Sequence, residues 1–66
     1  MKLYVYTLTE RCNWTDQWET KIVGVLDKPV TYFHCDEVQV WEDGSLLYSA
    51  DKGTKGWNET HKGKTK

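Results

Sequence analysis

The side chains best suited to nucleophilic or metal chemistry are two cysteines and two histidines: Cys12, Cys35, His34 and His61. Two thiolates and two imidazoles would complete a tetrahedral zinc site. The spacing argues against it, because such sites usually take closely spaced pairs of ligands from each segment. His34 and Cys35 are adjacent, and on a strand they would point to opposite faces. The sequence therefore predicts no metal site and no cofactor.

Catalysis is disfavoured for similar reasons. The adjacent histidine and cysteine diverge on a strand and cannot act as base and nucleophile. The acidic doublets Asp36-Glu37 and Glu42-Asp43 are typical of solvated turns. The glycines with turn-like flanks have no following helix, so the chain contains no phosphate-binding loop. We therefore expect a protein that is not an enzyme.

The two cysteines leave two structural alternatives. In a reducing compartment they would be small buried hydrophobic residues. In an oxidising one, a Cys12–Cys35 disulfide would stabilise the fold by about 3 kcal/mol. The opening residues show no signal-peptide pattern, and no apolar stretch approaches the length of a membrane span. A cytoplasmic protein with no membrane contact is the resulting prediction.

Size and charge restrict the remaining functions. With 66 residues the chain is one small domain. Its apolar content is low, and the 14% of aromatic residues compensates because large rings can support a small core. Residues 1–51 hold four basic and nine acidic residues, a net charge of −5, whereas residues 52–66 hold five lysines and one glutamate, a net charge of +4. An acidic body argues against binding a phosphate backbone.

Alternating apolar and polar residues predict strands over residues 2–10, 21–27, 30–35, 38–42 and 45–50. Asp43-Gly44 predicts a tight hairpin turn. Residues 11–20 break the alternation and read as a loop, or as one helical turn with Trp14 and Trp18 on one face. The fold class is therefore all-β: a small antiparallel meander of four to five strands over residues 1–51, forming a curled sheet or a small barrel. Residues 52–66 are predicted to be a disordered, flexible Lys/Gly-rich tail.

The hairpin at Asp43-Gly44 has two apolar faces. An ideal two-residue turn pairs Trp41 with Leu46 and Gln39 with Tyr48, which places Trp41, Leu46 and Tyr48 on one face. The same pairing places aliphatic residues on the other face, which we predict to lie inside. These residues are Val38, Val40 and Leu47, and Leu3 and Val5 from the first strand join them.

The aromatic face is the predicted interaction surface, since tryptophan and tyrosine dominate binding hot spots. Acidic charge among these residues favours a protein partner with a basic surface, such as the nucleic-acid groove of an enzyme. In general style the chain is similar to accessory proteins of phages and mobile elements that inhibit a host protein by occluding it. A homodimer through the aromatic face or an edge strand is compatible with this function. The alternative is that the rings pack as a second small core. The predicted partner-binding residues are Trp41, Leu46, Tyr48, Tyr4, Tyr6, Trp14 and Trp18.

The alternative function is single-stranded nucleic-acid binding through the tail. Small β domains can stack bases on aromatic rings beside lysines. The predicted residues for this function are Lys52, Lys55, Trp57, Lys62 and Lys64.

Overall fold

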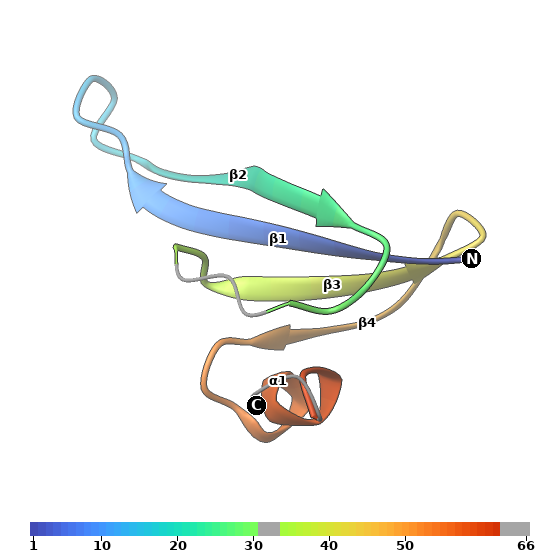
Figure 1. The fold of residues 1–66 in the computed structure, drawn as a ribbon. Coiled ribbons are helices and arrows are strands. Elements are labelled where there is room, and N and C mark those ends of the chain that lie inside the picture. The colour runs from blue at the N-terminus through green and yellow to red at the C-terminus, as the bar shows by residue number, and fades with distance from the viewer. Residues whose placement is uncertain (31–33, 63–66) are drawn as a thin grey trace.

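The computed structural model describes residues 1–30 and 34–62, and it contains one antiparallel sheet followed by a short helix (Figure 1). The strands are β1 (Lys2–Arg11), β2 (Trp18–Leu26), β3 (Glu37–Glu42) and β4 (Ser45–Asp51), and the helix is α1 (Lys55–Thr60). The strand order is β2-β1-β3-β4. The predicted small all-β fold with a curled antiparallel sheet is confirmed, and the sheet stays open.

The predicted strand at 30–35 is absent from this sheet as far as the structure describes it. Val30 and Cys35 are not in a strand, and residues 31–33 lie outside the described part of the chain. Instead, β1 pairs on one side with β2 and on the other with β3, which makes it a central strand.

The β3–β4 turn forms as the sequence indicates. Asp43 and Gly44 both have positive φ, 51° and 84°, which is the conformation a two-residue hairpin turn requires. The register beyond the turn differs from the ideal one, because Leu47 is an extra residue: Trp41 pairs with Leu46, but Val40 pairs with Tyr48. This bulge moves Tyr48 to the same face as Val40.

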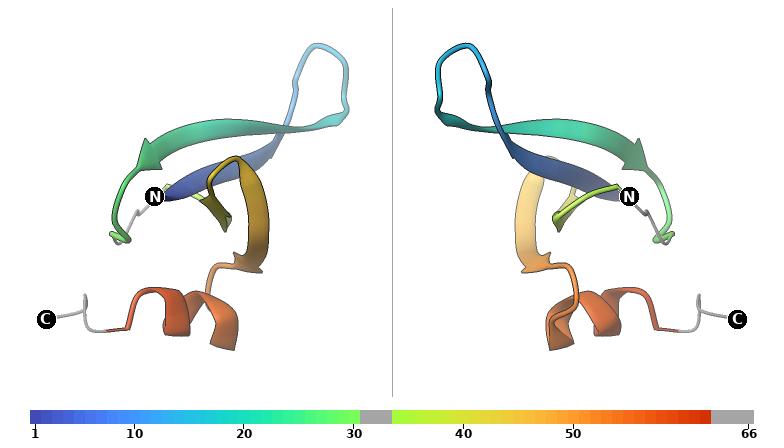
Figure 2. Two further views of the ribbon diagram at one scale, coloured as in Figure 1. Left: turned by 90° about the vertical axis from the view of Figure 1, so that its right-hand side faces the viewer. Right: turned by 90° about the vertical axis from the view of Figure 1, so that its left-hand side faces the viewer.

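The core lies on the concave face of the sheet, which curls toward α1 (Figure 2). Val38 and Val40 are buried there, as predicted. The predicted contribution of Leu3, Val5 and Leu47 is wrong, and Leu47 is 48% exposed. The β1–β3 register pairs Tyr6 with Val38 and Leu3 with Trp41, so the tyrosines of β1 face inward and its aliphatic residues face outward.

Residues 55–60 are helical, so the flexible tail predicted from residue 52 is wrong for this segment. The Thr54 hydroxyl oxygen caps the helix by accepting the Trp57 N–H at 3.3 Å. Gly56 permits close packing on β4, since a Cβ there would lie 3.1 Å from the Ala50 Cβ. Trp57 and His61 are consequently buried against the sheet.

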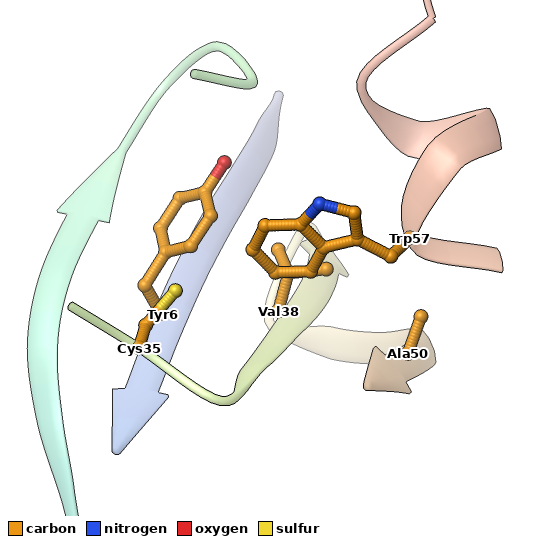
Figure 3. Packing of buried hydrophobic residues seen from close by; sticks show 5 residues of the cluster. All are labelled: Tyr6, Cys35, Val38, Ala50 and Trp57. Atoms are coloured by element: carbon orange, nitrogen blue, oxygen red, sulfur yellow. The ribbon is translucent and has the colours of Figure 1, made fainter. Parts of the chain in front are cut away.

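The core joins the first strand to the helix (Figure 3). The Tyr6 ring meets Trp57 edge to face with centroids 6.0 Å apart, and its hydroxyl lies 2.9 Å from His61 Nε2. That hydroxyl donates to the Val30 carbonyl at 2.9 Å and accepts the Val30 N–H at 3.0 Å. His61 Nδ1 donates to the Trp57 carbonyl at 2.9 Å, because a carbonyl oxygen only accepts. Tyr6 is completely buried, which corrects its placement in the predicted interaction surface.

Beyond residue 7 the β1–β2 hairpin extends past β3 as a two-stranded ribbon, called the arm here (residues 8–21; Figure 1). Its tip is closed by two backbone hydrogen bonds of 2.8 Å, from Cys12 N–H to the Gln17 carbonyl and from Asp16 N–H to the Cys12 carbonyl. Asp16 has positive φ and its carboxylate pairs with Arg11. The predicted shared helical face of Trp14 and Trp18 is wrong, because Trp18 begins β2.

Candidate interaction surface

The convex face of the sheet carries apolar side chains from all four strands. Register places these residues side by side, and we call them the convex patch: Leu3, Val5, Ile22, Val25, Trp41 and Leu46. Leu3, Val25, Leu46 and Ile22 are between 37% and 65% exposed, although α1 covers the opposite face. Scattered exposed apolar residues are ordinary, but a contiguous group of them is typical of an interaction site.

Two acidic side chains lie beside the convex patch. Glu37 and Asp51 are directly paired across β3 and β4 on this face. The repulsion between their carboxylates destabilises this strand pair, and a nearby cation would reduce it. Glu37 is held in place by the Thr7 hydroxyl, which donates to its carboxylate at 3.1 Å. Trp41 is oriented similarly, since its indole N–H donates to the Gln39 side-chain oxygen at 3.1 Å.

The predicted partner-binding residues are distributed over three places. Trp41 and Leu46 lie in the convex patch, as cross-strand partners. Tyr4, Tyr6 and Tyr48 face the concave side, where the Tyr48 hydroxyl lies 2.8 Å from the Thr60 hydroxyl. Trp14 and Trp18 are on the arm, 95% and 72% exposed.

Sequence reasoning missed the contribution of Leu3, Val5, Ile22 and Val25 to this surface. Alternation identified Leu3 and Val5 as one face of a strand, but it could not tell which face was covered. In β2 a bulge between Ile22 and Gly24 adds Val23, which packs against the core. The glycine in mid-strand was the available signal for that bulge.

The predicted nucleic-acid residues that the structure describes do not form a stacking surface. Lys52, Lys55 and Lys62 are exposed, whereas Trp57 is buried against Tyr6. Lys64 lies outside the described residues.

The arm also holds Cys12, one of the two cysteines of the chain. The thiol of Cys12 is half-exposed, which corrects the expectation that both cysteines are buried, and it borders a depression of about 160 Å³ that Glu10, Arg11, Glu19 and Lys21 also line. Hydrogen bonds to its sulfur, chiefly from the backbone and hydroxyl of Thr15, lower the pKa of Cys12. Cys35 is buried, and this burial raises its pKa.

We therefore expect iodoacetamide to alkylate Cys12 well before Cys35, since the thiolate is the nucleophile. The measurement is peptide mass spectrometry of the native protein over a pH series. The alkylation rate of Cys12 should rise at lower pH than that of a cysteine in an unstructured peptide. Thr15→Val should move this pH profile to higher pH, because the variant lacks the hydroxyl that bonds the sulfur. Equal rates for both cysteines would contradict the structure.

Within residues 1–30 and 34–62, no three His, Cys, Asp or Glu side chains are grouped to hold a metal ion. No helix in this part of the chain is long and apolar enough to cross a bilayer.

Comparison with known proteins adds no information about this surface. No family model, curated protein or solved structure matches this chain.

Proposed function

We propose that this chain is a small non-catalytic binding protein that docks on another protein through its convex patch. The observation that carries this proposal is the open sheet with α1 on one face and, on the other, exposed apolar side chains from β1, β2 and β4 beside the half-buried Trp41 of β3. Burying such side chains stabilises a complex by about 25 cal/mol per Å² of apolar surface.

The tryptophans of the arm would add a second contact with the partner. Trp14 and Trp18 are strongly exposed, and tryptophan is among the residues most enriched at binding hot spots. The hydrogen-bonded tip holds Trp14 on a closed turn, so little conformational entropy is lost when it is covered.

The charge of the convex face supports a basic partner surface. Glu37 and Asp51 are forced together by the register, and a lysine or arginine of the partner would relieve their repulsion. A protein of this size that covers a basic functional surface would act by occlusion, and we propose inhibition of a host protein in the cytoplasm as the mode of action. Nucleic-acid binding receives less support, because Trp57 would have to leave the core to stack on a base.

The test is affinity capture from the native host with the unaltered chain and two variants, Val25→Glu and Leu46→Glu. Both positions are exposed, so the fold should be preserved while a charge in the apolar contact prevents docking. The matched control is Asn58→Glu, an exposed position on α1.

We expect one captured protein to be lost with both patch variants and retained with the control. Retention of that protein by Val25→Glu and Leu46→Glu would exclude the convex patch as its binding site.

A further inference from the structure

We propose that two copies of this chain associate through the outer edges of their β2 strands, paired antiparallel about a two-fold axis at Thr20. The two four-stranded sheets would then form one continuous sheet. This inference does not depend on the convex patch having a partner.

The backbone of β2 has the correct polarity for this pairing. Directly after β1, the Cys12 N–H donates to the carbonyl of Gln17, the residue before β2. On β1 itself, the Thr9 N–H and the Thr7 carbonyl bond on the opposite side, both to Asp36. The backbone N–H and carbonyl groups of successive residues point to opposite sides of a strand. Those of Leu8 and Glu10 therefore also point toward β2, and those of their partners Lys21 and Glu19 point toward β1.

It follows that the N–H and carbonyl groups of Trp18, Thr20 and Ile22 point outward from β2, where the described part of the chain supplies no neighbouring strand. Unpaired groups of this kind are a template for another strand. A two-fold axis at Thr20 would let the two Thr20 residues exchange both backbone hydrogen bonds.

The side chains around Thr20 are self-complementary. In this register Glu19 lies opposite Lys21 of the second copy, and Lys21 opposite its Glu19, which gives two cross-strand ion pairs. Trp18 likewise lies opposite Ile22 of the second copy on the convex side. These two apolar residues are 72% and 65% exposed in the single chain.

The ion pairs can form without breaking an existing one. Lys21 Nζ lies 2.8 Å from the Glu10 carboxylate, and both side chains remain about half-exposed. Lys21 can therefore bridge Glu10 and the incoming Glu19, since an ammonium group has three donors.

The other edges of the sheet are less accessible. α1 packs beside β4, and the Asp36 carboxylate accepts the Thr9 N–H where β1 extends past β3. The arm also gains most from pairing, because a two-stranded ribbon is marginally stable in water.

Sedimentation equilibrium over a concentration series measures the association. We expect a monomer–dimer equilibrium, with Glu19→Lys and Lys21→Glu each weakening the dimer by about tenfold or more as attraction becomes repulsion at two sites. An equimolar mixture of these two variants should recover the dimer, because every opposed pair is then Lys with Glu. Circular dichroism checks that each variant is folded.

Two further variants keep the result interpretable if a charge reversal disturbs the arm. Thr20→Pro removes an outward N–H that β1 does not use, and it should abolish the dimer while the fold persists. Val25→Glu lies outside the paired segment and should leave the dimer intact, which separates this proposal from the convex patch. A monomer at every concentration, or a dimer unaffected by Thr20→Pro and both charge reversals, would overturn the proposal.

Discussion

Replacing Trp57 with alanine is expected to lower the free energy of unfolding by about 3–5 kcal/mol. The indole is 7% exposed and fills the space between the Tyr6 ring and the helix. A chain of this size has a total stability of roughly 3–10 kcal/mol, so the variant should be largely unfolded or close to it. The reason is that α1 has six residues, too few to form without its packing.

Urea denaturation followed by circular dichroism measures this effect. Trp14→Ala is the matched control, because the same indole is removed from a position that is 95% exposed, and its free energy of unfolding should stay within about 0.5 kcal/mol of the original. If both variants lost equal stability, Trp57 would not be part of the core.

Removing a single oxygen in Tyr6→Phe is expected to cost about 2–4 kcal/mol. The loss leaves both backbone groups of Val30 and the Nε2 atom of His61 without their phenol partner in a buried site. Tyr48→Phe is the control, since the hydroxyl of Tyr48 bonds Thr60 at an exposed position and its loss should cost less than about 1 kcal/mol. Equal effects of the two variants would show that the Tyr6 hydroxyl is solvated.

The same pair of variants tests the pH dependence of stability. Burial raises the pKa of Tyr6 above its ordinary value of 10.0. The neutral phenol is therefore favoured in the folded state, and its contribution is complete below pH 10 and is lost as the pH rises through the higher folded pKa. We expect the original chain to lose stability steeply above pH 10 in a series of denaturation curves. Tyr6→Phe should lack this component, and Tyr48→Phe should retain it.

The sequence predicted local structure where one or two residues determine it. Asp43-Gly44 specified the hairpin turn, because few other pairs accept positive φ at both positions. The alternation of β1 and β3 specified two apolar faces. Which face was covered depended on β1 pairing with β3 across the chain, and alternation contains no information about that distant register.

Two bulges and one short helix account for the remaining differences. An added residue at Leu47 moved Tyr48 to the concave face, since one residue reverses the side of every later side chain. α1 is too short for a helical period to be recognised, although Trp57 and His61 are spaced four apart and follow a capping threonine. Trp41 and Leu46 consequently share one face, as predicted, whereas Tyr6 is buried on the other face. The role of Trp41 and Leu46 in binding stays a prediction.

The contact between Tyr6 and His61 joins positions 55 residues apart, and it has a consequence for synthesis. While the chain is being made, β1 emerges before β3 and α1, with its tyrosine face unprotected. β3 can pair beside β1 once residue 42 has emerged, but Trp57 and His61 cannot cover the Tyr6 ring until residues near 61 have left the ribosome. The β1–β2 hairpin can form earlier, but the core can close only after the chain has been translated beyond His61.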